Sequence, residues 1–345
     1  MLTGAGLIIT VEICMFAYLV RRVVSALPLL VLITLVSFAV IDAPPGDYMT
    51  TVINRLQSQG GLSREEALKI ASQLRETYGL DKPFFLRYGK WVFGILHGDL
   101  GYSFQYRKPV SRIIWRRMGW TFLIALLCHM ISVIGGVLIG IYSAVNQYSI
   151  SDYIFTVFAF LGLSIPNFFL ALALIYILVF WGGVSHVGGL FSPALGADPW
   201  SWAKFVDLLK HIWVPVVAVG TAGIARNMRI MRGNLLDVLR EPYIQTARAK
   251  GLRESMVIYK HAVANAIQPI IMYLGMTLPW LIQGTVVVGI VLSLPTAGPM
   301  FYNALISQDT YLAGSFLFLV AIALVIGNIL ADLLLAWIDP RVRYE

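Results

Sequence analysis

The stretch EPYIQTARAKGL, residues 241–252, is short and polar, and it interrupts a chain that is mostly apolar. A glycine at its end favours a left-handed exit from a helix. A polar helix without a hydrophobic core of its own suits docking to another protein, although a solvated loop helix explains the same pattern. The small and cationic side chains that give the stretch its character are Ala247, Ala249, Arg248 and Lys250.

The composition places this stretch in a membrane protein. The chain has 345 residues, of which 58% are hydrophobic and 13% charged, whereas soluble domains average about a quarter charged residues. The net charge of +8 fits loops rich in Lys and Arg on the cytoplasmic side of a membrane. We see no basic face on a soluble domain, as a nucleic-acid-binding protein would need. Cys14 and Cys128 lie in apolar stretches and indicate neither a disulfide nor a metal site.

Six segments are long and apolar enough to predict transmembrane helices, each of which needs roughly 20 residues. We therefore expect an all-α polytopic membrane protein. Prolines 28, 166, 215, 269 and 279 are expected to kink these spans. The predicted spans cover residues 23–42, 120–144, 153–181, 211–231, 265–292 and 311–338.

The distribution of basic residues predicts the orientation of the spans. Arg21 and Arg22 precede the first span, which places the N-terminus in the cytoplasm. After four crossings, residues 226–260 carry eight Lys or Arg against three acids, and the tail after the sixth span carries Arg341 and Arg343. Both termini and the opening stretch are therefore expected to be cytoplasmic. The loop at 145–152 has no Lys or Arg and adds no support.

Residues 43–118 are predicted to be a folded extracytoplasmic segment. They contain twelve Lys or Arg, but loops longer than about 60 residues cross a membrane largely regardless of charge. Ser63 and Glu66 form the pattern of a capping box, and Gly79 marks the end of the same helix. One face of that helix is predicted to be apolar through Ala67, Ile70, Ala71, Leu74 and Tyr78.

The longer stretch EPYIQTARAKGLRESMVIYKHAVANAIQP resembles the cytoplasmic coupling loop of permease subunits of ABC importers, in the branch that carries peptides. The matching positions are Tyr243, Thr246 to Leu252, His261, Ala262, Asn265, Ala266 and Pro269. The first span with its Pro45, Gly46 and Asp47 turn, the stretch YGLDKPFFLRYGKWVFGILHGDLGYSFQYRKPV, and DPRVR near the C-terminus resemble the same family. Departures occur at Pro44, a second proline before the turn, and in the stretch SLPTAGPMFYNALISQD after the fifth span.

The resemblance implies the type I ABC importer permease fold and a set of partners. These are a homologous second permease, two ABC ATPase subunits and an extracytoplasmic solute-binding protein, in the cytoplasmic membrane of a bacterium or archaeon. The chain itself is implied to be a pore subunit and not an enzyme. The resemblance implies that the coupling residues are Glu241, Tyr243, Thr246, Ala247, Arg248, Ala249, Lys250, Gly251 and Leu252.

No cofactor is expected in this chain, whereas ATP and Mg²⁺ are implied on the partner subunits. A phosphate-binding Gly-x-x-x-x-Gly-Lys-Ser/Thr motif is missing, because the one Gly-Lys pair, at Gly89 and Lys90, is followed by Trp91. We expect no metal ligands and no catalytic residues. Peptide is the first substrate implied by the resemblance, with oligosaccharide, nickel and glutathione as alternatives.

The expected domain organisation follows from these features. Residues 15–118 form the first span and the extracytoplasmic segment, and residues 119–338 form a five-helix core that contains the coupling loop 233–262. Residues 339–345 form a cytoplasmic tail. Residues 1–14 are either an extension or an interfacial helix, and the sequence does not decide between them.

Two other classes of function stay open at this point. A self-contained secondary transporter needs ionisable groups within its spans, and His129 is the main candidate, although a buried neutral histidine explains it as well. An intramembrane hydrolase would need a nucleophile and a base, and Ser132 with His129 is a weak pair. Asp332 and Asp339 are expected to be interfacial anchors, and Gly136 with Gly140 a close helix contact.

Overall fold

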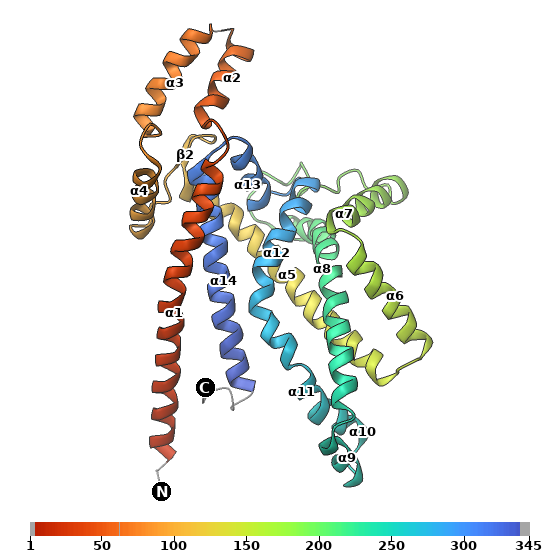
Figure 1. The fold of residues 1–345 in the computed structure, drawn as a ribbon. Coiled ribbons are helices and arrows are strands. Elements are labelled where there is room, and N and C mark those ends of the chain that lie inside the picture. The colour runs from red at the N-terminus through yellow and green to blue at the C-terminus, as the bar shows by residue number, and fades with distance from the viewer. Residues whose placement is uncertain (1–3, 62, 339–345) are drawn as a thin grey trace. The chain divides into compact units, whose positions relative to one another are not determined.

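The computed structural model describes residues 4–61 and 63–338, and it is mostly helical (Figure 1). Two short strands, Tyr102–Ser103 and Lys108–Pro109, pair antiparallel as β1 and β2. Two π-helical turns are η1 (Ile177–Trp181) and η2 (Val257–Ala262). The α-helices are α1 (Gly4–Asp42), α2 (Tyr48–Gly60), α3 (Arg64–Tyr78), α4 (Phe84–Leu96), α5 (Val110–Val145), α6 (Ile150–Ser164), α7 (Asn167–Tyr176), α8 (Trp202–Val238), α9 (Pro242–Ala249), α10 (Glu254–Met256), α11 (Val263–Ala266), α12 (Gln268–Val291), α13 (Ala297–Ile306) and α14 (Thr310–Ile338).

Four helices of the described chain are long and apolar enough to cross a membrane by themselves. They contain Arg21–Asp42 of α1, all of α5, all of α8, and Thr310–Leu330 of α14. The predicted first, second, fourth and sixth spans are thus confirmed as helices. The predicted fifth span coincides with α11 and α12, of which the apolar part that can be assessed is Ile282–Val291. The total of six spans therefore stays a prediction.

The predicted third span, over 153–181, is formed by two helices and not by one straight helix. Helices α6 and α7 meet at an angle of 105°, so this segment is either a broken span or a re-entrant loop. Pro166 has no N–H to donate and disfavours helical geometry at the residue before it, and Ile165 accordingly has φ −84° and ψ 121°. The kink predicted at Pro166 is confirmed, and it is large enough to end the helix.

The other prolines are accommodated within helices. Pro28 lies inside α1 and Pro215 inside α8, whereas Pro269 occupies the first turn of α12, where a missing N–H breaks no helical hydrogen bond. Pro279 falls within α12. Among the acids expected to anchor the last span, Asp332 falls within α14 and Asp339 lies outside the described residues.

The described chain divides into two compact units. The first consists of residues 4–16, 121–295 and 323–338, and the second of the described residues of 17–120 and 296–322. In the second unit the predicted capping box is confirmed: the Ser63 hydroxyl accepts from the Glu66 N–H, and the Glu66 carboxylate accepts from the Ser63 N–H at 3.0 Å. The expected apolar face of α3 is buried at Ala67 and Ala71, but Ile70 is exposed. Gly79 ends α3 at φ +68°.

Two carboxylates organise the second unit. Asp47 caps α2 and accepts from Arg75 of α3 at 2.7 and 2.8 Å, so one side chain ties both helices together. Asp309, fully buried, accepts from the Ser103 hydroxyl at 2.6 Å and from the Gln105 N–H at 3.1 Å. Burial raises the pKa of the Asp309 carboxyl above its usual value, and the hydrogen bonds it accepts oppose that shift.

In the first unit, glycines allow α5 and α8 to approach closely, which confirms the predicted role of the Gly136 and Gly140 pair. A Cβ added at Gly136 would lie 2.5 Å from Cβ of Asn227. Polar side chains tie the same two helices, because the Ser132 hydroxyl donates to the Gly220 carbonyl at 3.0 Å and the Asn227 amide donates to the Ser132 carbonyl at 3.0 Å.

The close contact at Gly136 can be tested by substitution, with the adjacent Gly135 as a control. Gly136→Ala forces α5 and α8 apart, so we expect a loss of about 1–3 kcal/mol in the free energy of unfolding, as other overpacked interiors show. Gly135→Ala is the control, because its nearest neighbour would be 3.4 Å away and alanine favours a helix by about 0.5–1 kcal/mol over glycine. Thermal unfolding of the two purified variants measures the difference. Equal midpoints would contradict the close contact.

Candidate functional site

Helix α9 contains most of the residues that the sequence singles out, and local rules explain where it starts and ends. Glu241 occupies the N-cap position with extended backbone, and Pro242 fits the first turn. At the other end, the Leu252 N–H donates to the Ala247 carbonyl at 3.4 Å and the Gly251 N–H donates to the Arg248 carbonyl at 2.9 Å. This is a Schellman motif, and it requires the φ of +76° found at Gly251.

The helix turns one narrow face inward and the rest outward. Ile244 is fully buried and Ala247 nearly so, whereas the other eight predicted coupling residues are exposed. The small side chain of Ala247 therefore serves packing within the chain. Ile244, which the sequence analysis did not single out, is the main anchor. The exposed residues are Glu241, Tyr243, Thr246, Arg248, Ala249, Lys250, Gly251 and Leu252.

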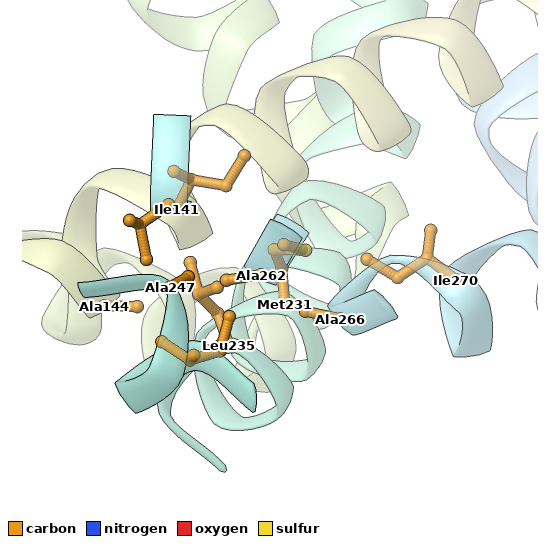
Figure 2. Packing of buried hydrophobic residues seen from close by; sticks show 10 residues of the cluster. Ile141, Ala144, Met231, Leu235, Ala247, Ala262, Ala266 and Ile270 are labelled. Atoms are coloured by element: carbon orange, nitrogen blue, oxygen red, sulfur yellow. The ribbon is translucent and has the colours of Figure 1, made fainter. Parts of the chain in front are cut away.

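The inward face of α9 packs in a cluster that draws on the ends of two long helices (Figure 2). Ile141 and Ala144 come from α5, and Met231 and Leu235 come from α8. The segment after α9 closes the cluster through Val257, Ala262, Ala266 and Ile270. Figure 1 shows α9 and α10 gathered at the end of α8 that lies away from α7. A short surface helix is thereby fixed to two predicted spans and to the start of α12.

Polar contacts hold the rest of the segment in place. The Arg248 guanidinium donates to the Glu254 carboxylate at 2.7 Å, across the turn made by Gly251. This contact holds the pKa of Glu254 below its usual value and raises that of Arg248. The Asn265 amide donates to the Tyr243 hydroxyl at 2.9 Å and to the His261 carbonyl at 3.1 Å. Tyr243, His261 and Asn265, which all match the family pattern, are thus hydrogen-bonded to one another.

A second group of residues near this cluster was missed in the sequence. Asp152, at the start of α6 and nearly fully buried, accepts from Arg232 of α8 at 2.8 and 2.9 Å. It also accepts from the Ser143 hydroxyl of α5 and from the Tyr148 N–H. One carboxylate therefore joins α5, α6 and α8. Ser149 caps α6 through the Asp152 N–H, and this Ser-x-x-Asp spacing is a capping pattern that could have flagged the segment.

Three residues whose roles the sequence leaves undecided, Cys128, His129 and Ser132, all lie on α5. His129 is half-buried on α5, and the Ser132 hydroxyl is engaged with the Gly220 carbonyl, so Ser132 has a packing role in this structure. Within the described residues, no group of three or more His, Cys, Asp or Glu side chains is arranged to hold a metal ion. Cys128 is a free, buried cysteine.

The fold and this site define a helical membrane protein with a short, exposed surface helix rooted in its membrane core. Comparison with known proteins is more specific. Residues 136–344 match the family described as binding-protein-dependent transport system inner membrane component, and residues 15–125 match the N-terminal part of such membrane components.

Curated relatives agree with this match over nearly the whole chain. The sequence is 35% identical to an oligopeptide transport system permease protein, AppB of Bacillus subtilis, over 96% of this chain and all of that protein. It is 30% identical to a dipeptide transport system permease protein, DppB of Escherichia coli, with the same coverage. A glutathione transport system permease protein, GsiC of Pectobacterium atrosepticum, is 31% identical over 96% of this chain and all of that protein. The chain belongs to the inner membrane components of binding-protein-dependent transport systems, the ABC permeases that the coupling stretch resembles.

The Asp152 group and the exposed Arg248 pair together give a graded test of the site. Asp152→Asn leaves Arg232 without its counter-charge, and removing one partner of a buried pair costs about 3–5 kcal/mol of stability. Glu254→Gln breaks an exposed pair, which contributes about 0–1 kcal/mol. Chemical unfolding of the two purified variants compares the losses. A loss for Asp152→Asn no larger than that for Glu254→Gln would show that the carboxylate does not hold the three helices together.

Proposed function

We propose that this chain is one of two transmembrane subunits of an ATP-driven importer, and that residues 241–252 transmit the motion of a separate ATPase subunit to the membrane helices. The observation that carries the proposal is the division of α9 into an exposed outer surface and an inner face packed on α5 and α8. An outer surface alone would describe a docking site. The inner packing adds a rigid route from that site into the spans.

The exposed side of the segment has the chemistry that a protein partner can recognise. Arg248 and Lys250 are exposed cations, and Tyr243 and Leu252 are exposed side chains with apolar area. Their positions are set by the Schellman motif and by the Arg248–Glu254 contact, so little ordering is left to occur on binding. A partner that pushes on this side displaces the cluster beneath it, because packed interiors deform little.

The other subunits follow from the family. We propose a homologous second permease that completes the pathway, two ABC ATPase subunits that bind ATP and Mg²⁺, and a solute-binding protein on the opposite side of the membrane. On this proposal residues 119–338 are the permease core, and 15–118 contribute the first span and the extracytoplasmic segment. ATP hydrolysis takes place on the partners, because this sequence lacks the phosphate-binding motif.

We propose di- or oligopeptides as the transported substrates. Two relatives support this substrate class. AppB, an oligopeptide permease, and DppB, a dipeptide permease, are 35% and 30% identical to this chain over nearly its whole length. The glutathione permease relative is compatible with this class, since glutathione is itself a small peptide. Uptake of a labelled dipeptide and a labelled pentapeptide into vesicles that contain the assembled complex, with and without ATP, tests both the mechanism and the substrate class. Uptake that is independent of ATP would refute the mechanism.

Gly251 provides a test of transmission that separates it from assembly. Gly251→Val places a β-branched residue at φ +76°, where a non-glycine residue costs about 1–2 kcal/mol, a factor of about 5–30 in an equilibrium. We expect peptide uptake and peptide-stimulated ATPase activity to fall at least about fivefold. The expected loss comes from backbone strain and not from steric crowding, since a Cβ at this position meets no heavy atom within 4 Å.

The control for this test is Gly251→Asn, because asparagine tolerates the left-handed conformation better than valine does. We expect it to retain most of the activity. Co-purification of the ATPase subunits with both variants checks that assembly survives. Full activity of Gly251→Val would show that the geometry of this turn is not needed for transmission.

The proposed orientation is tested separately, with single cysteines on a background that lacks Cys14 and Cys128. Lys250→Cys is expected to react with a membrane-impermeant maleimide only when the cytoplasmic side is accessible. Ser72→Cys, on the exposed surface of α3, is expected to react from the opposite side in intact cells. Reaction of Lys250→Cys in intact cells would overturn the proposed topology and the role of α9 with it.

A further inference from the structure

Helix α4 has apolar side chains on two opposite faces. Its inner face packs on α1, where the ring of Phe38 lies 5.6 Å from that of Phe84, 5.7 Å from that of Tyr88 and 5.5 Å from that of Trp91. Residues 84, 88 and 91 recur at helical spacing and so form one stripe. This packing lies within the second unit, which contains α4 and the part of α1 from Ala17 onward, and it accounts for only one side of α4.

The other face of α4 is apolar and exposed. Phe85 is 76% exposed, Phe93 65% and Leu96 77%, and Leu86 is exposed beside them. These side chains lie on one face because residues 85, 89, 93 and 96 are also spaced as helical neighbours. Charged side chains occupy only a narrow flank, at Arg87 and Lys90. Four large apolar side chains on one short helix form a patch, which differs from the scattered exposed residues that are normal on a soluble surface.

The depth of α4 in the bilayer can be inferred from its contacts with α1. The Tyr88 hydroxyl donates to the Val31 carbonyl at 3.2 Å and forms a hydrogen bond with the Thr34 hydroxyl at 3.0 Å. Val31 stands eleven positions before Asp42, the last residue of α1, or roughly 16 Å along a helix. The hydrocarbon core of a bilayer is roughly 30 Å thick. The Tyr88 hydroxyl therefore reaches about halfway along the apolar span. The α4 rings themselves pack beside Phe38, which stands four positions, or roughly 6 Å, before Asp42.

The polar side of α4 fits the same depth. Arg87 donates to Asp42 at 2.6 and 2.9 Å, so its charge is neutralised at the end of α1. Lys90 has a long side chain that can extend its ammonium group to the membrane surface. Tyr88 has both of its partners on α1, and hydrogen bonds made inside the protein are what a hydrocarbon environment requires.

We propose that the outer face of α4, formed by Phe85, Leu86, Phe93 and Leu96, binds the acyl chains of phospholipids in the leaflet at the Asp42 end of α1. The neighbouring α1 exposes Leu32, Val36 and Val40 over the same stretch, so apolar surface at this depth continues onto a spanning helix. Interfaces between membrane helices are enriched in small residues, whereas this face consists mainly of Phe and Leu. The segment 43–118 is then not wholly extracytoplasmic, because it re-enters the bilayer at α4.

Spin labelling of the assembled transporter tests this proposal. A nitroxide is attached to Phe93→Cys, with Cys14 and Cys128 replaced, and the complex with its co-purifying subunits is placed in vesicles of phosphatidylethanolamine and phosphatidylglycerol. Power saturation then measures collisions with oxygen, which concentrates in lipid, and with a water-soluble nickel chelate. Val36→Cys on α1 is the lipid reference and Ser72→Cys on α3 is the aqueous reference.

We expect the label at Phe93→Cys to match Val36→Cys in its collisions with oxygen, and to collide with the nickel chelate at least about fivefold less often than Ser72→Cys does. Collisions with nickel as frequent as at Ser72→Cys would place α4 in water and overturn the proposal. Low collision rates with both reagents would show that another protein covers this face, and would overturn it equally. Leu86→Cys repeats the measurement on the same face if Phe93→Cys does not assemble.

Discussion

The packing of Ile244 and Ala247 against the ends of α5 and α8 is the contact on which the proposed coupling surface depends. An isolated helix of eight residues is far too short to be stable in water, and α9 has only these two inward side chains. Their burial fixes the helix on the membrane core and leaves its other residues exposed. The segment that follows, through Val257 and Ala262, completes the same cluster, so the helix is enclosed on its inner side.

Near this contact, hydrogen bonds to Asp152 connect α5 and α8 to a third helix, α6. Asp152 ties α6 to α8 through Arg232 and to α5 through Ser143, close to the ends of α5 and α8 that hold α9. On the proposed mechanism, a displacement of α9 is therefore shared by α5, α6 and α8. Beyond α6, the chain bends by 105° at Pro166. Helix α7 nevertheless packs on α8 and on α12, so it stays attached to the same group of helices.

The sequence predicts well what is decided locally. The capping box at Ser63, the left-handed turns at Gly79 and Gly251, and the break at Pro166 each follow from residues within one turn of the chain. The long apolar helices follow from composition over some 20 residues. Ile244 escaped notice because one apolar residue in a polar stretch has no periodic pattern around it. Arg232 and Asp152 are 80 positions apart, and only the tertiary structure brings them together.

The same limit explains why the surroundings of α4 and of Ala247 could not be predicted. A helix that is apolar on two opposite faces has no single apolar stripe, so its sequence does not distinguish a protein-covered face from a lipid-covered one. A small residue on a docking helix is equally compatible with a partner's backbone and with a neighbouring helix of its own chain. At Ala247 the side chain was correctly interpreted as small, but the surface it meets had to come from the structure.

Three polar side chains that join helices of the first unit bear on the source of energy for transport. Ser132 and Asn227 each donate to a backbone carbonyl of the facing helix, and Asp152 is matched by Arg232. Groups satisfied in this way stabilise helix packing, and moving a proton or ion through them would first require breaking those bonds. On the proposal above, the force that moves these joined helices is applied from outside the membrane. On that proposal the exposed surface of α9 receives the force, because its inner face is packed on α5 and α8.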